Sequence, residues 1–362
     1  MKDSCRVALL CAIVVVTGIT VAFLARIAAP PRLPQAHHLP RVKGQLPSRQ
    51  KSESLRCNAR RVSDSEAAAL GFKPLSQSTA DGVEKFVVFV GYQRSGHTLI
   101  GSVMDAHPNM LISNTLFLLR SCAFTEIGER LFKNKTRLFN TIYKDSFLLS
   151  ICGSRNGTAT NKGYSLAVTG QWQGKFSQLR VVGEKSGGST SLQLQHDRGM
   201  TCWKQLVDSI GIPIVGIHVV RNPFDMIATE SLYRLSKVKE TKASDLVYGK
   251  LRPGLTMLTE EATRVFKQAN SVENFSKKVP VVEIHIEDYI KDPKSAVLKI
   301  CKGLGLPCPE DYVEECYNKA YGSVSRTRDL IEWEPEVIES IQRNMKKIPF
   351  FHGYTFEDSF RH

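Results

Sequence analysis

The sequence predicts an α/β fold in which a P-loop-like parallel sheet is flanked by helices on both faces. Short runs rich in β-branched residues alternate with helix-like segments, an order typical of parallel sheets covered by helices. One run is apolar throughout, as expected of a strand buried on both faces. Another run ends in a glycine-bounded turn that resembles a phosphate loop. The expected strands are Phe86–Val90, Val181–Gly183, Ile214–Val220 and Val281–Ile286.

The N-terminal residues differ in composition from the part of the chain that is predicted to form the sheet. Val7–Ala25 contains 19 residues without a charge, close to the length that spans a bilayer as a helix. We therefore expect a cytoplasmic tail at residues 1–6 and a transmembrane signal anchor at residues 7–29, with a cleaved signal peptide as the alternative. Three glycosylation sequons are usable only if the C-terminal part is lumenal. They begin at Asn134, Asn156 and Asn274.

Residues 30–80 are expected to form a basic, flexible stem. They are rich in Pro, Ser, Gln and charge and show no sustained apolar period. The part from Pro30 to Val62 carries a net charge of +7, half of the +14 of the chain. This charge could attract anionic glycans or lipid headgroups, although a solvated tether is the preferred interpretation. Nucleic acid is not an expected partner of a lumenal chain.

The chain has nine cysteines, and no zinc-type spacing occurs among them. Cys5 and Cys11 fall in or before the apolar segment, which leaves seven in the expected lumenal part. An oxidising compartment permits disulfides, and an odd number leaves one cysteine free or paired between chains. Cys57 is a candidate for such an intermolecular bridge. The candidate pairs are Cys122 with Cys152 and one pair among Cys301, Cys308 and Cys316.

The turn Gly91–Thr98 has the frame G-x-x-x-x-G-K-[ST] of a phosphate loop, with His97 in place of the lysine. A loop that hydrolyses a nucleoside triphosphate needs this lysine on the β- and γ-phosphates. Backbone N–H groups at a helix N-terminus can still hold a phosphate without it. Arg94 is the cation that the turn offers. The sequence therefore predicts a nucleotide-phosphate site and disfavours a P-loop kinase or NTPase.

A second segment of the sequence predicts a binding site for another phosphate. The strand Ile214–Val220 runs into Arg221, and Thr229 follows eight residues later on a helix-like segment. A guanidinium and a hydroxyl in this arrangement can reach one phosphate together. Ligands of parallel sheets bind at the carboxyl ends of the strands. Arg94, Lys185 and Arg221 each follow a predicted strand, so we expect all three in one crevice.

These blocks resemble the donor-binding segments of sulfotransferases that use 3′-phosphoadenosine 5′-phosphosulfate (PAPS). The run Asp105–Pro108 is similar to a segment of Golgi and tyrosylprotein members. Weaker matches occur at Val181–Ser186, around Val281–Leu306 and from Trp333 to Tyr354, so that the resemblance covers roughly residues 84–356. It implies a lumenal sulfotransferase domain at residues 81–362 of a Golgi type II membrane protein, similar to carbohydrate sulfotransferases.

The resemblance also implies residue roles. Arg221 and Thr229 would hold the 3′-phosphate of PAPS, and Thr98 would donate to the 5′-phosphate. The implied donor-binding residues are Gly91, Arg94, Ser95, Gly96, His97, Thr98, Arg221 and Thr229. The implied catalytic residues are Arg94, Lys185, Glu184 and His97. Arg94 and the N–H groups of the turn would stabilise the leaving phosphate, and neither a metal nor a redox group is required.

The general base is the open question. Related enzymes commonly place a glutamate shortly after the Asp105–Pro108 run, but Leu111–Leu116 contains no carboxylate. The candidates are Glu184, Glu126, His97 and His218. Glu184 is the first choice because it neighbours Lys185 at a strand end. Trp172 is a candidate for the acceptor cleft, with a plain core position as the alternative.

The expected function is transfer of a sulfuryl group from PAPS to a hydroxyl of a glycan or glycoprotein. A tyrosylprotein-type sulfotransferase and a non-catalytic relative that binds PAPS, its product PAP or a glycan are the alternatives. The membrane is an expected partner through the N-terminal helix. The oligomeric state and the sugar stay open.

Overall fold

The computed structural model describes residues 62–114, 116–156, 165–238, 253–320 and 322–362, all within one compact unit, Leu55–His362. The expected signal anchor at residues 7–29 lies outside these ranges. Within them, no helix is both long and apolar enough to cross a bilayer.

The folded part begins before residue 81. Two short helices, α2 (Asp64–Ala69) and α3 (Gln77–Asp81), occupy the end of the segment expected as a stem. Ser63 and Glu66 form a capping box at the start of α2, which satisfies backbone donors that would otherwise have no partner. Phe72 then packs in a small cluster with Phe147. This apolar contact packs the otherwise polar segment of α2 and α3 against the rest of the domain.

The sheet confirms the predicted α/β class, because all five strands are parallel. Their order is β2 (Met110–Ser113), β3 (Val181–Glu184), β1 (Lys85–Gly91), β4 (Ile214–Val220) and β5 (Val281–His285). Strand β2 is not among the predicted strands, because four residues after a turn are too few to show a recognisable apolar periodicity. After the central β1, the chain forms β2 and β3 on one side of it and then β4 and β5 on the other side. This switch point beyond the carboxyl end of β1 is where ligands of such sheets bind.

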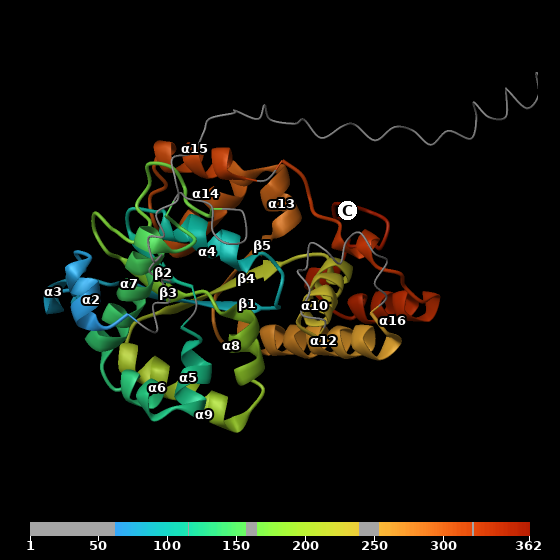
Figure 1. The fold of residues 1–362 in the computed structure, drawn as a ribbon, viewed down its shortest axis with the longest axis horizontal. Coiled ribbons are helices and arrows are strands. Elements are labelled where there is room, and N and C mark those ends of the chain that lie inside the picture. Colours follow the sequence, from blue (N-terminus) through green and yellow to red (C-terminus); the bar gives the residue numbers. More distant parts are fainter. Residues whose placement is uncertain (1–61, 115, 157–164, 239–252, 321) are drawn as a thin grey trace, which may run out of the picture. The chain divides into compact units, whose positions relative to one another are not determined.

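Helices cover both faces of the sheet (Figure 1). Along β1, Val87 and Phe89 pack into one core cluster and Phe86, Val88 and Val90 into another, as the two-residue period of a strand requires. The first cluster includes residues of α4 (His97–Asp105), α14 (Pro293–Leu304) and α15 (Glu310–Lys319). The second includes residues of α5 (Leu118–Phe124), α7 (Lys135–Cys152), α9 (Asp197–Ile210) and α12 (Leu255–Ser276).

A third core cluster joins α12 to α10 (Pro223–Val238) and α16 (Pro335–Met345). The remaining elements lie around the sheet and its ends. They are α6 (Glu126–Leu131), α8 (Gly187–Gln193), α13 (Ile286–Lys291) and the 3₁₀ turns η1 (Thr327–Leu330) and η2 (Pro349–Phe351).

Two disulfides lie within the described ranges. Cys301 pairs with Cys308, which confirms a pair among the three C-terminal candidates, and Cys316 is free and buried. The expected pairing of Cys122 with Cys152 is wrong, because Cys122 bonds Cys202 across a Cα–Cα distance of 6.0 Å. Helices α5 and α9 pack together on one face of the sheet. That contact brings Cys122 close to Cys202, although the two residues are separated by 80 positions in the sequence.

We expect the Cys122→Ala/Cys202→Ala double variant to lower the free energy of unfolding by about 4 kcal/mol, because a long loop gains much entropy in the unfolded chain. Urea titration of both proteins without reductant measures the difference. The matched control is Cys301→Ala/Cys308→Ala, whose sequence separation of 7 predicts a loss of about 2 kcal/mol. Equal losses for the two pairs would contradict this account.

Candidate active site

The predicted phosphate loop is a tight turn between β1 and α4. Gly91 and Gly96 have φ angles of +129° and +98°, and Arg94 has a φ of +64°. A Cβ atom at Gly96 would lie 2.8 Å from Cδ1 of Ile286, so only glycine fits there. No side chain caps the N-terminus of α4, which begins at His97. Its first N–H groups are thus available to an anion.

A cleft of about 930 Å³ opens beside this turn, within the usual size range of small-molecule sites. Arg94, Gly96, His97 and Thr98 line it together with Lys185. The structure therefore brings Arg94 and Lys185 into one crevice, as expected from the strand ends. Gly91, Ser95, Glu184, Arg221 and Thr229 are not among its lining residues.

Arg94 is held by two residues of α10. Its Nε donates to Oε2 of Glu230 at 2.6 Å, and its guanidinium carbon lies 4.1 Å from the ring centroid of Tyr233. Glu230 thus neutralises the cation of the loop in this conformation. Glu230 was not predicted to take part, because its only sequence signal is its place directly after Thr229. An anionic ligand at the loop would compete with this carboxylate for Arg94.

Lys185 reaches from the end of β3 to the start of α4. Its Nζ donates to Oγ1 of Thr98 at 2.9 Å. A Cβ atom at Gly101 would lie 2.7 Å from Cγ of Lys185, so this glycine makes room for the lysine stem along α4. The ammonium group therefore lies beside the phosphate loop.

His97 contributes an uncharged ring. Burial, together with the charges of Lys185 and His218, lowers its pKa from 6.5 to about 3. The imidazole is thus neutral at physiological pH, with Nε2 3.3 Å from the carbonyl oxygen of Val90. It fills the space beside Gly187, where a Cβ atom would lie 2.5 Å from its Cε1. His97 therefore cannot replace the positive charge of the missing lysine.

Arg221 and Thr229 lie together next to the phosphate loop. Nη1 of Arg221 donates to the carbonyl oxygen of Arg94 at 3.0 Å and to Oγ1 of Thr229 at 3.4 Å. Nη2 donates to the carbonyl oxygen of Ser325 at 3.0 Å and to Oγ1 of Thr327 at 3.2 Å. The expected pair is therefore assembled, and its guanidinium is oriented by four acceptors. The segment 325–327 was not predicted to take part.

This C-terminal segment is fixed by a buried ion pair. Nη1 of Arg328 donates to Oδ2 of Asp225 at 2.5 Å, and both side chains are fully buried. Asp225 also accepts from the backbone N–H of Arg328 at 2.9 Å. The pair connects η1 to the first turn of α10 and so keeps Ser325 and Thr327 against Arg221.

A buried chain of hydrogen bonds joins the phosphate loop to the turn that carries Arg221. At one end the hydroxyl of Tyr92 lies 3.3 Å from Nε2 of His218. At the other end Glu287 accepts from the N–H of Asn222 at 2.9 Å. The residues between are Glu283, His285 and Tyr354. His218 is thus a satisfied core residue, and Tyr354 of the C-terminal segment helps to position both the phosphate loop and the turn that carries Arg221.

The candidate bases lie in different environments. Glu184 is buried, and its Oε1 accepts from the N–H of Ser186 at 3.0 Å and of Phe117 at 3.3 Å. Glu126 is exposed and pairs with Arg130. Trp172 is partly exposed but does not line the cleft. The carboxylate that does line the cleft is Glu230.

Burial raises the pKa of Glu184 from 4.5 to about 7. The native carboxyl keeps its proton at pH values where the unfolded chain has lost it, so the free energy of unfolding falls as the pH rises from about 4.5 to about 7. Glu184→Gln cannot ionise but can still accept both backbone hydrogen bonds. We therefore expect the free energy of unfolding of this variant to rise by up to about 3 kcal/mol relative to that of the unchanged protein between about pH 4.5 and about pH 7. Urea titrations at several pH values test this, and parallel stability curves would contradict it.

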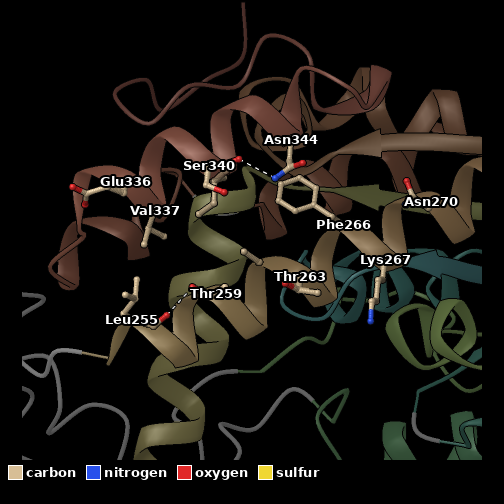
Figure 2. A pocket seen from close by; sticks show the side chains of 12 residues that line it. Leu255, Thr259, Thr263, Phe266, Lys267, Asn270, Glu336, Val337, Ser340 and Asn344 are labelled. Atoms are coloured by element: carbon tan, nitrogen blue, oxygen red, sulfur yellow. Dashed lines mark hydrogen bonds between the residues drawn. The ribbon is translucent and has the colours of Figure 1, made fainter.

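A second hollow, of about 440 Å³, lies between α12 and α16 (Figure 2). Its lining includes Phe266, Val337 and Ile341, with Lys267 and Glu336 as its charged residues. It lacks both the phosphate loop and Arg221, so it is not the candidate site. Within the described parts of the chain, no group of three or more His, Cys, Asp or Glu side chains could hold a metal ion.

Neither family models nor curated proteins match this chain. Among solved structures, a sulfotransferase from Mycobacterium avium is similar over 73% of this chain and 76% of its own, with 11% identity and a TM-score of 0.40. A sulfotransferase from Alicyclobacillus acidocaldarius is similar over 72% and 92%, with 14% identity and a TM-score of 0.39. A mouse sulfotransferase in complex with PAP is similar over 75% and 88%, with 12% identity and a TM-score of 0.36.

Proposed function

We propose that the protein is a sulfotransferase that moves a sulfuryl group from PAPS to a hydroxyl of a glycan. The observation that carries the proposal is the pair Arg221 and Thr229, held directly beside a phosphate loop that lacks the NTPase lysine. PAPS carries phosphates on both sides of one ribose, at the 3′ and 5′ positions. A loop for one phosphate with a separate guanidinium and hydroxyl for another matches this pattern.

In the proposed reaction, an acceptor oxygen forms a bond to sulfur while the bond from sulfur to the phosphate oxygen of PAPS breaks. The electron pair of that bond stays on the phosphate, and PAP leaves. The N–H groups at the start of α4, with Arg94 and Lys185, would stabilise this developing charge. Binding of the donor would draw Arg94 away from Glu230, to which it is now bound.

The acceptor hydroxyl must lose its proton to a base. Glu184 has a pKa of about 7, which suits a base at neutral pH, and it lies one residue from Lys185. Its burial means that a shift of the Phe117 segment would have to expose it first. This burial also favours the second candidate function, a non-catalytic protein that binds PAP or PAPS.

We further propose a Golgi type II membrane protein, anchored by residues 7–29, with the domain in the lumen. The disulfides Cys122–Cys202 and Cys301–Cys308 suit an oxidising compartment. The sequon residues Asn134 and Asn274 are exposed, as glycosylation would require. The proposed acceptors are glycans or glycoproteins, and a tyrosylprotein acceptor is the alternative.

Calorimetric titration of the purified protein with PAP and with ADP tests the donor site without knowledge of the acceptor. We expect PAP to bind at least about 10-fold more tightly than ADP, because only PAP carries the 3′-phosphate. Equal affinities would contradict the proposed donor. Incubation with ³⁵S-labelled PAPS and a glycan panel then tests transfer. Preferential PAP binding without transfer to any glycan or tyrosine peptide would favour the non-catalytic protein.

A further inference from the structure

We propose that the side of the cleft formed by Phe117, Arg120 and Phe124, together with Arg198, binds the acceptor, and that this acceptor is an acidic saccharide. We call these four residues the α5 wall. The inference rests on the proposed function, because it assigns the phosphate-loop side of the same cleft to the donor.

The α5 wall begins where the transferred group would lie. Phe117, Arg120 and Phe124 line the same cleft as Thr98 and Lys185, whose side chains contact each other at the phosphate loop. Glu230 and Tyr233 of α10 also line the cleft, and the same helix carries Thr229. Because a donor bound to Arg221 and Thr229 lies toward α10, the α5 wall is left for the acceptor.

An aromatic ring is exposed in this wall. Phe124 is 66% exposed, so its ring is accessible to a ligand in the cleft. The guanidinium carbon of Arg198 lies 6.0 Å from its ring centroid. A flat aromatic face of this kind can stack on the C–H face of a pyranose ring, while the neighbouring cation contacts a substituent of the sugar.

Neutral polar side chains support a saccharide over a peptide. Ser189 and Gln193 of α8 also line the cleft, and α8 packs against α5. Hydroxyl and amide side chains both donate and accept hydrogen bonds. They match the hydroxyl groups of a sugar, each of which also does both.

The charge of the wall favours an acidic acceptor. Among the described residues, Glu230 is the one acidic residue that lines the cleft, and it is bound to Arg94. Arg120 and Arg198, in contrast, have no ion-pair partner among the residues that the structure describes. Uncompensated guanidinium groups beside a binding surface select carboxylate or sulfate groups. We therefore expect a uronate or sulfate group on the sugar that stacks on Phe124.

The test measures equilibrium binding to the full-length protein, with and without saturating PAP. The probes are an unsulfated chondroitin hexasaccharide, which is acidic, the neutral chitohexaose and a glutamate-rich tyrosine peptide of similar charge. We expect the acidic hexasaccharide to bind at least about 10-fold more tightly than either of the others. Arg120→Gln should abolish the preference over chitohexaose, and Phe124→Ala should weaken both saccharides.

Arg130→Gln is the matched control, since Arg130 is an exposed arginine on α6 that does not line the cleft. It should leave all affinities unchanged. Equal binding of the two saccharides, tighter binding of the peptide, or an unchanged preference in Arg120→Gln would each overturn the inference. The titration with PAP and ADP tests the donor separately. If the saccharides bind as expected but PAP binds no more tightly than ADP, the proposed donor is wrong and the α5 wall still stands.

Discussion

Replacing Arg221 with alanine is expected to weaken PAP binding about 100-fold while ADP binding stays nearly unchanged. The guanidinium lies beside the phosphate loop and is oriented by Arg94, Thr229 and the segment 325–327. Hydrogen bonds to a charged group contribute about 1.5–3 kcal/mol each, so loss of the guanidinium removes most of the binding energy of the 3′-phosphate. ADP has no 3′-phosphate and cannot lose this contribution.

Calorimetry with both nucleotides gives the two affinities. ADP serves as the internal control, since damage to the phosphate loop would weaken PAP and ADP alike. Arg221→Lys keeps the charge but not the forked geometry, and we expect it to recover only part of the affinity. Arg343→Ala, which removes an exposed arginine of α16, should change neither affinity. Equal losses for PAP and ADP in Arg221→Ala would show that Arg221 supports the loop and does not read the 3′-phosphate.

Asp105→Ala is expected to lower the free energy of unfolding by about 3–5 kcal/mol, because it leaves a buried guanidinium without its counter-charge. Asp105 and Arg155 are both buried, and their charged atoms are 2.6 Å apart. The carboxylate also accepts from the N–H of Ile112 at 2.7 Å and from the hydroxyl of Ser146. It thus connects α4 to β2 and α7, and it does not line the cleft.

Urea titration of Asp105→Ala measures this loss. The matched control is Asp64→Ala, because Asp64 also contacts a cation at 2.7 Å but is 96% exposed. Exposed ion pairs contribute about 0–1 kcal/mol, so the control should change little. Equal small losses would mean that the buried pair is not needed for the fold. Unchanged PAP affinity in the folded Asp105→Ala variant would mark Asp105 as a structural residue.

The features that depend on residues close together in the chain could be predicted from the sequence. Apolar β-branched runs predict buried parallel strands because every residue of such a strand meets a helix. The tight turn between β1 and α4 follows from Gly91 and Gly96, which adopt positive φ angles. Arg221 and Thr229 also come together through one turn and one helix, so their contact was predictable from spacing.

The contacts between distant segments could not be predicted in this way, because they depend on how the helices pack. Glu230 reaches Arg94 across 136 positions, and Cys122 reaches Cys202 across 80, because helix packing selects these partners and local pattern does not. Likewise, no sequence signal distinguishes a buried Glu184 from an exposed one, although burial sets its pKa. The charge state of the site is therefore a property of the packed fold, since desolvation and ion pairing depend on which segments exclude water from each group.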